Sequence, residues 1–162
     1  MNSSFHSIQS IAPLAERFRA SGLKLVLATG FFDLLHQEHI NFLKKASSQG
    51  DVLFVAVESD KRARTLKGEG RPLESQAIRC RNLITNHLAD YVIALDDTFN
   101  NYAAYESLIS AIKPSVYAVS SHTSYQENKK RLVEKYGGQL IIVHPHNPKL
   151  STTQLINTKK QL

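Results

Sequence analysis

The sequence predicts an α/β protein with an open, parallel, five-stranded sheet and helices on both faces. Short β-rich runs alternate with segments of helical periodicity, which is the pattern of repeated strand–helix–strand units. The first two strand runs are almost continuously apolar, as expected of parallel strands covered on both faces. No linker rich in Pro, Gly or Ser divides the 162 residues, so we expect one domain over residues 1–162.

Each element is predicted from its own local pattern. We expect strands at residues 24–28, 52–57, 91–95, 116–119 and 140–143. Helices are expected at residues 7–21, around the apolar stripe of residues 40–46, and at 74–88, 102–112 and 126–136. Gly50, Pro114 and Gly137–Gly138 mark the ends of three of these helices. A last helix starts at Ser151–Thr152–Thr153, whose hydroxyls can cap it.

Composition removes several classes of protein. The 20 Lys and Arg residues against 14 Asp and Glu give a net charge of +6, which suits an anionic partner without naming one. Because Cys80 is the only cysteine, an internal disulfide is impossible and a cysteine-based zinc site lacks ligands. We expect no nucleic-acid partner, since no aromatic stacking pattern or known binding motif accompanies the charge.

The sequence also bears on where the protein works. No apolar run approaches the roughly 20 residues of a membrane helix. Residues Met1–Ser10 show no basic segment followed by a hydrophobic one, so we expect no secretory signal. The expectation is therefore a cytoplasmic protein without a membrane partner.

The turn after the first strand carries the chemistry. It runs from Thr29 to His39 as TGFFDLLHQEH, and it contains neither a dinucleotide fingerprint nor a P-loop. His36 and His39 are three residues apart where the next helix begins, so they share a helical face among free N–H donors that favour phosphate. The alternatives are a structural pair or a metal pair. A metal would need a third ligand, and the candidates His122, His144 and His146 show no ligand spacing.

Thr29-Gly30-x-Phe32-Asp33-x-x-His36-x-x-His39 resembles the T/N-G-x-F-D-x-x-H-x-G-H signature of the cytidylyltransferase-like nucleotidyltransferases. The resemblance covers residues 7 to about 160 and continues through Gly50-Asp51, Ser59-Asp60, Leu66-Lys67-Gly68-x-x-Arg71-Pro72, Arg79 and Ser151-Thr152-Thr153. The chain resembles the adenylyltransferase domain of ADP-heptose synthases and, less strongly, the glycerol-phosphate cytidylyltransferases. The resemblance implies a Rossmann-like fold of the nucleotidyltransferase type.

The resemblance also implies an activity. Such an enzyme transfers a nucleoside monophosphate from ATP or CTP to a sugar phosphate or polyol phosphate and releases pyrophosphate. His36, His39 and Lys67 would be the catalytic side chains, stabilising charge on the reacting phosphates. The nucleotide-binding residues would be these two histidines with Thr29, Gly30, Phe31, Phe32, Arg71, Arg79, Ser151, Thr152 and Thr153. Mg²⁺ would be carried by the nucleotide phosphates without a protein metal site, and a homodimer is possible because relatives often form one.

Each of these residues also has a purely structural interpretation. Ser151–Thr153 can be a simple helix cap, and Phe31 and Phe32 can be core residues. Lys67, Arg71 and Arg79 can be solvated charges, while Asp33 is expected to fix the turn or cap the helix. Residues 61–71 lack an apolar period, so we expect them to be mobile without ligand and ordered by a bound triphosphate.

Two departures from the family pattern fall on the nucleoside side. Glu38 stands where the signature has glycine, and its carboxylate would compete with phosphate for the helix N–H donors. We expect Glu38 to weaken triphosphate binding, unless it turns outward or contacts the nucleoside. The G-x-D stretch of relatives reads Val119-Ser120-Ser121-His122-Thr123, and their Pro-Asp is Pro114-Ser115. A catalytically silent paralogue that binds a nucleotide or phosphate ligand is the alternative.

Overall fold

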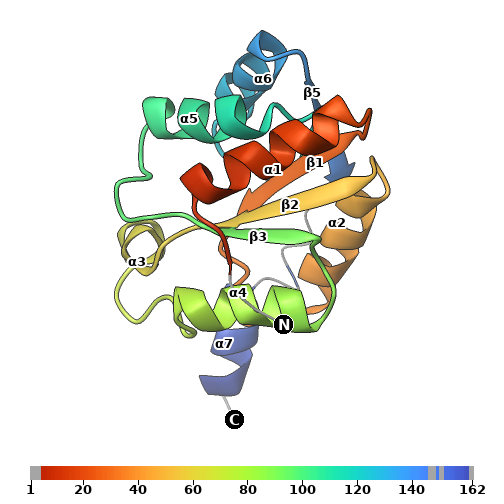
Figure 1. Cartoon of the computed structure of the whole chain (residues 1–162). Helices are drawn as coiled ribbons and strands as arrows, with labels where there is room; N and C mark the ends of the chain where they lie inside the picture. Colours follow the sequence, from red (N-terminus) through yellow and green to blue (C-terminus); the bar gives the residue numbers. More distant parts are fainter. Residues whose placement is uncertain (1–4, 146–148, 150–151, 161–162) are drawn as a thin grey trace.

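The structure is a computed structural model that describes residues 5–145, 149 and 152–160, apart from the side chains of residues 159 and 160. A five-stranded parallel sheet has the order β3-β2-β1-β4-β5, with helices on both faces (Figure 1). The strands are β1 (Leu25–Gly30), β2 (Val52–Val57), β3 (Tyr91–Ala94), β4 (Val116–Ser120) and β5 (Gln139–His144). The helices are α1 (Ile8–Ala20), α2 (Gln37–Ser47), α3 (Asp60–Lys67), α4 (Gln76–Thr85), α5 (Tyr102–Ile112), α6 (Gln126–Lys135) and α7 (Thr152–Lys160).

Alternate residues of each central strand enter two separate cores. Leu25 and Leu27 of β1 pack on one face, against buried apolar residues of α1, α5 and α6. Val26 and Ala28 face the other way, toward buried residues of α2 and α4. Helices cover both faces, which explains why the strands are nearly all apolar and confirms the predicted layers. None of the helices in the described residues has the length and apolar character needed to cross a bilayer.

The strand order places the site. From β1 the chain builds the sheet outward to β2 and β3, and it then returns to the other side of β1 for β4 and β5. The carboxyl ends of β1 and β4 are therefore the switch point where ligands of such sheets bind. All five predicted strands are confirmed within two residues at each end, and β1 continues to Gly30. Because all five strands run parallel, the turn after β1 lies at this edge.

One element differs from the sequence prediction. Residues 60–67, expected to lie in a flexible stretch, form helix α3. Ser59 caps its first turn by accepting a hydrogen bond from the Arg62 N–H. The negative charge of Asp60 is stabilised at the positive end of the helix dipole. Gly68 ends the helix with a positive φ of 92°. Only Ala63 of this helix is buried, which is why no apolar period marks it. The ordering of residues 61–71 by a triphosphate stays a prediction.

Candidate functional site

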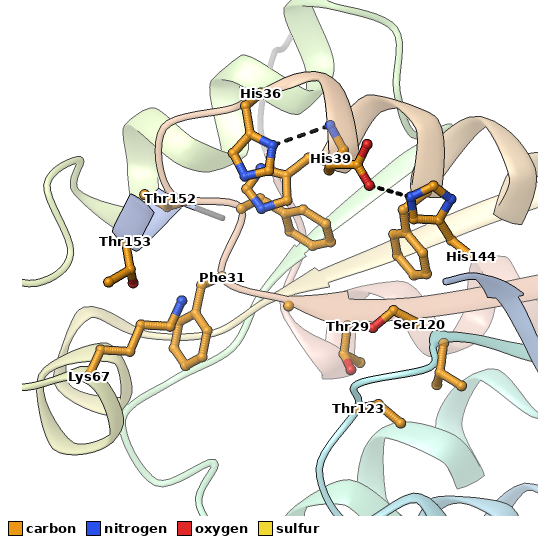
Figure 2. A pocket seen from close by; sticks show the side chains of 15 residues that line it. Thr29, Phe31, His36, His39, Lys67, Ser120, Thr123, His144, Thr152 and Thr153 are labelled. Atoms are coloured by element: carbon orange, nitrogen blue, oxygen red, sulfur yellow. Dashed lines mark hydrogen bonds and ion pairs between the residues drawn. The ribbon is translucent and has the colours of Figure 1, made fainter. Parts of the chain in front are cut away.

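A cavity of about 270 Å³ opens at the switch point, between the ends of β1 and β4 and the beginnings of α2 and α7 (Figure 2). The structure brings nine of the sequence-predicted site residues to its wall: Thr29, Gly30, Phe31, Phe32, His36, His39, Lys67, Thr152 and Thr153. Ser151, another predicted site residue, lies outside the described residues. Glu38, Phe42, Val119, Ser120, Thr123 and His144 complete the lining.

The two histidines form a stacked pair at the start of α2. His36 is the N-cap residue of this helix, and its Nδ1 accepts a hydrogen bond of 3.2 Å from the Glu38 backbone N–H. Its ring lies on that of His39, with centroids 3.8 Å apart and an angle of 22° between the planes. Because Nδ1 of His36 accepts, the proton of the neutral ring is on Nε2, which leaves an N–H donor for a ligand.

Burial keeps the pair neutral. It lowers the pKa of His39 to about 3, with further lowering by the neighbouring His36 and Lys67. Burial also lowers the pKa of His36, although Glu38 opposes this effect. His39 Nδ1 is buried and has no hydrogen-bond partner among the described residues. At neutral pH these rings therefore present N–H dipoles rather than positive charges.

The turn that holds the histidines has a costly backbone conformation. Phe32 and Leu34 both have left-handed φ values, 53° and 48°, and each costs about 1–2 kcal/mol in a residue with a side chain. The Phe32 ring packs against Gly30, where a Cβ would come within 3.0 Å of the ring. Such a turn persists only when its surroundings fix it.

Asp33 supplies that fixation. Its carboxylate is 1% exposed and accepts hydrogen bonds from the Leu73 and Glu74 N–H groups and from Nε of Arg71, at 3.0–3.1 Å. The Thr152 hydroxyl donates to the Asp33 carbonyl at 2.8 Å, which ties the start of α7 to the same turn. Of the two roles expected for Asp33, fixing the turn is confirmed, whereas the helix is capped by His36. Asp33 instead joins the turn to a segment 40 residues away.

The charge of Asp33 is stable in this setting. Burial alone would raise the pKa of its carboxyl, but the two backbone N–H donors and the Arg71 guanidinium outweigh that effect and lower it. Asp33 and Arg71, which is 9% exposed, thus form a buried and hydrogen-bonded ion pair. The pair depends on both partners, since either charge alone would be costly in this place.

Lys67 is the last residue of α3, and the helix directs its side chain to the cavity (Figure 2). Its Nζ lies 4.6 Å from the centroid of the Phe31 ring, a cation–π contact. Desolvation and the neighbouring Arg71 lower the pKa of Lys67. A phosphate in the cavity would meet this ammonium group beside the two neutral imidazoles.

Arg71 and Arg79, both expected to bind nucleotide, do not line the cavity. Arg71 pairs with Asp33 and donates to the Thr153 hydroxyl at 3.3 Å. Its Nη2 is buried and has no partner in the described part of the chain, so contact with a phosphate stays a prediction.

Arg79 is fully buried, which corrects both the surface and the nucleotide-contact interpretations. Its guanidinium donates to the carbonyls of Phe31, Glu58 and Glu74 and to the Asp60 carboxylate. It therefore joins the turn after β1, the end of β2 and the starts of α3 and α4. Local pattern predicts a helix at this position but not the partners of Arg79, which come from distant segments.

Glu38 turns away from the helix N-terminus. Its Oε2 lies 2.7 Å from Nε2 of His144 at the end of β5, and Nδ1 of the same ring lies 3.1 Å from Nζ of Lys45. An ammonium group can only donate, so Nδ1 accepts and Nε2–H donates to Glu38. The expected competition for the helix N–H groups is therefore replaced by a side-chain pair on the cavity wall (Figure 2).

His144 and Thr123 were missing from the predicted site. Both follow or end a strand at the carboxyl edge of the sheet, and that position is the signal that could have found them. Among the residues described, no group of three or more His, Cys, Asp or Glu side chains gathers that could hold a metal, so the metal alternative gains no third ligand there. The candidate ligand His146 lies outside the described residues.

Comparison with known proteins decides the family. The family model described as cytidylyltransferase-like matches residues 27–159. The chain belongs to the cytidylyltransferase-like family. It is therefore a nucleotidyltransferase by family, with the parallel α/β fold of that group.

Similar proteins agree with this placement. The bifunctional protein HldE of Geobacter metallireducens is 37% identical over 85% of the chain, and that of Wolinella succinogenes is 42% identical over 68%. The matches span 27% and 22% of those proteins, so the chain spans less than a third of these relatives. The lipopolysaccharide core biosynthesis protein of Thermoplasma volcanium has a TM-score of 0.61 and 27% identity, over 76% of this chain and 96% of that one. Pantothenate synthetase of Thermus thermophilus, at 12% identity, shares the fold, with a TM-score of 0.65 over 96% of this chain and 69% of its own.

Proposed function

We propose that this chain transfers a nucleoside monophosphate from ATP or CTP to a sugar phosphate or polyol phosphate and releases pyrophosphate. The observation that carries the proposal is the stacked pair of His36 and His39 in a cavity that also holds Lys67. Two neutral N–H donors and one cation, fixed at the carboxyl edge of a parallel sheet, suit a triphosphate whose charge shifts during reaction.

The reaction needs no nucleophile from the protein. An oxygen of the acceptor phosphate attacks the α-phosphorus in line; the new P–O bond forms as the bond to the β-phosphate breaks, and pyrophosphate takes the electron pair. A phosphate monoester is largely ionised at neutral pH, so no general base is required. The task of the protein is to hold two anions together and to stabilise the charge that develops.

The site residues divide this task. His36 and His39 donate from their rings to the reacting phosphates, and their neutrality spares the site a proton transfer at pH 7. Lys67, beside Phe31, offsets negative charge on the phosphates. Thr153 and the start of α7 would contact the outer phosphates of the triphosphate. The Asp33 network keeps these groups in place before the substrate arrives.

We propose that Mg²⁺ enters with the triphosphate. The described residues place hydrogen-bond donors and cations at the cavity but no cluster of metal ligands. This arrangement fits a metal ion that is coordinated mainly by phosphate oxygens. When bound, the ion would neutralise part of the phosphate charge.

The second candidate is a silent paralogue that binds the nucleotide without reaction, and the reason to consider it is the position of Glu38. Its side chain occupies part of the cavity wall where the family signature has glycine. The pairing with His144 removes the carboxylate from the N–H donors, which favours the enzyme over this alternative.

The test combines binding and turnover. Thermal unfolding with ATP, CTP, GTP and UTP identifies the nucleotide, since a ligand at 100 times its dissociation constant adds about 2.7 kcal/mol of stability. Pyrophosphate release is then measured with that nucleotide and a panel of sugar phosphates and polyol phosphates. Stabilisation without pyrophosphate release on any acceptor indicates the silent paralogue; no stabilisation by any nucleotide contradicts both candidates.

A further inference from the structure

A buried phenol lies directly behind the first cavity, the one at the switch point. Tyr117 of β4 is fully buried, and its hydroxyl lies 2.8 Å from Oγ1 of Thr29, near the end of β1. Tyr117 is paired with Leu27, two residues before Thr29, so the side chains of Tyr117 and Thr29 lie on the same face of the sheet. Thr29 lines the first cavity (Figure 2), whereas Tyr117 lines neither that cavity nor a second one of about 240 Å³ among α3, α5 and α6.

The hydroxyl of Tyr117 is the part of this side chain that packing does not explain. Its ring belongs to an apolar core cluster that includes Leu27, Val119 and Leu132, where a phenylalanine ring would fill nearly the same space. A hydroxyl buried in such surroundings is destabilising unless it is hydrogen-bonded. Among the described residues, Thr29 is the sole hydrogen-bond partner of this phenol. The phenol oxygen therefore has one contact, and that contact is on the wall of the first cavity.

The burial of the phenol decides which hydroxyl donates in this hydrogen bond. If Thr29 donated, the proton of Tyr117 would have no acceptor in the described part of the chain. Buried polar groups are nearly always satisfied, so Tyr117 donates and Thr29 accepts. Burial also raises the pKa of Tyr117 well above its ordinary value of 10, so the phenol keeps this proton at neutral pH.

The fixed direction of this hydrogen bond determines what Thr29 offers to a ligand. A hydroxyl has one proton and two lone pairs, and Tyr117 occupies one lone pair of Oγ1. No other described residue forms a hydrogen bond with the Thr29 side chain, so its own proton is available on the cavity side. Thr29 thus adds a neutral donor to those of the two histidines and Lys67 on the same wall.

We propose that Tyr117 is a positioning residue for the nucleotide: its phenol holds the Thr29 hydroxyl with the proton directed into the first cavity, where it donates to an oxygen of the triphosphate. Tyr117 acts through Thr29 and does not touch the ligand. The hydrogen bond is in place before the ligand arrives, so binding does not have to reorient the hydroxyl. The inference rests on the proposed function, because the triphosphate is the ligand that this function requires.

Tyr117→Phe removes the phenol oxygen alone, and Tyr102→Phe is the matched control because Tyr102 is an exposed tyrosine at the start of α5. We expect Tyr117→Phe to raise the Kd for ATP or CTP, measured by titration calorimetry, about three- to tenfold, the range of one hydrogen bond. Thr29→Val should raise it about tenfold or more, because it removes a donor to a charged group. Thr29→Ser keeps the hydroxyl and should restore most of the affinity.

The double variant separates positioning from packing. Because Tyr117 acts through Thr29, adding Tyr117→Phe to Thr29→Val should change the nucleotide Kd less than about twofold. The same addition should raise stability in urea denaturation, because Thr29→Val leaves the buried phenol without an acceptor. In turnover, the effect of Tyr117→Phe should appear in the nucleotide KM, with kcat changed less than about twofold, because the triphosphate is already charged before it reacts.

Several outcomes overturn the inference. One is an unchanged nucleotide Kd in Tyr117→Phe, and another is an equal rise in Tyr102→Phe. A third is a further loss of affinity, beyond about twofold, when Tyr117→Phe is added to Thr29→Val. A fourth is a Tyr117→Phe chain that does not fold, which would make the phenol purely structural.

The two proposals fail separately. Nucleotide binding that depends on Tyr117 without pyrophosphate release contradicts only the proposed function. Pyrophosphate release with an unchanged nucleotide KM in Tyr117→Phe contradicts only this inference.

Discussion

The two ends of the first cavity are held in different ways. The imidazole end, formed by His36, His39 and Lys67, is anchored by the buried Asp33, which joins the turn after β1 to residues 71–74 and to α7. The carboxylate end, formed by Glu38 and His144, depends on one side-chain pair with Lys45 behind it. A change at the first end disturbs several segments, whereas a change at the second disturbs one contact. The comparison indicates a firmly held imidazole end beside an adaptable wall.

The largest expected effect is a loss of folding stability on replacing Asp33, which anchors the imidazole end. Asp33→Asn leaves the Arg71 guanidinium buried without a counter-charge and turns an amide NH₂ toward N–H donors. We expect a loss of about 3–5 kcal/mol in the free energy of unfolding, measured by urea denaturation. Asp97→Asn, at an exposed position, should stay within about 0.5 kcal/mol. If Asp33→Asn and Arg71→Met together cost the sum of their separate effects, the two side chains are not coupled and the anchor is misassigned.

The next effect is on turnover at the imidazole end. His36→Asn and His39→Asn should each lower kcat by about 10²–10³, because each removes a donor aimed at developing charge. The KM for the nucleotide should rise less, since these contacts strengthen in the transition state. His87→Asn is the matched control, because His87 is exposed and precedes β3 at the opposite edge of the sheet. A rise in KM with unchanged kcat would show that the histidines only bind the substrate.

A third prediction uses pH. The unfolded chain protonates His39 near its ordinary pKa of 6.5, whereas the folded chain holds the pKa near 3. Lowering the pH from 6.5 toward 3 therefore favours the unfolded state, by up to about 1.4 kcal/mol per pH unit from this residue. Urea denaturation of wild type and His39→Asn at pH 7 and pH 5 measures the difference. The variant should lose less stability; an equal loss in both proteins would mean that His39 is not kept neutral. The lowered pKa of Asp33 acts only at still lower pH.

The smallest effect belongs to the carboxylate end. Glu38→Gln keeps an acceptor for His144 and removes one negative charge from the first turn of α2. We expect ATP and CTP to bind about two- to fivefold tighter, the range of a charge at a helix end. Glu38→Gly should act in the same direction, with a small loss of fold stability. Glu127→Gln, in the first turn of α6, is the control for titration calorimetry. Weaker binding by Glu38→Gly, unequal for ATP and CTP, would show instead that Glu38 reads the nucleoside.

Much of the site was predictable because it lies close together in the sequence. Thr29 to His39 form one strand end and one helix start, so their common position follows from local pattern and the edge rule for parallel sheets. Helix α3 was also predictable in principle, because Ser59, Asp60 and Gly68 are local start and stop signals. Apolar periodicity did not predict this helix, since a helix that buries one residue has no apolar stripe.

Local sequence pattern was enough to predict the strands, most helices, the parallel layers and the pair His36 and His39, because these depend on neighbours within a few residues. The contacts of the long polar side chains, in contrast, depend on how distant segments pack. Arg79 is buried and bonds to several segments, and Asp33 pairs with Arg71. Glu38 pairs with His144, which is 106 residues away in the sequence. A charged side chain has several reachable partners of similar energy, and burial selects among them. That selection is made by packing between distant segments, which local pattern does not encode.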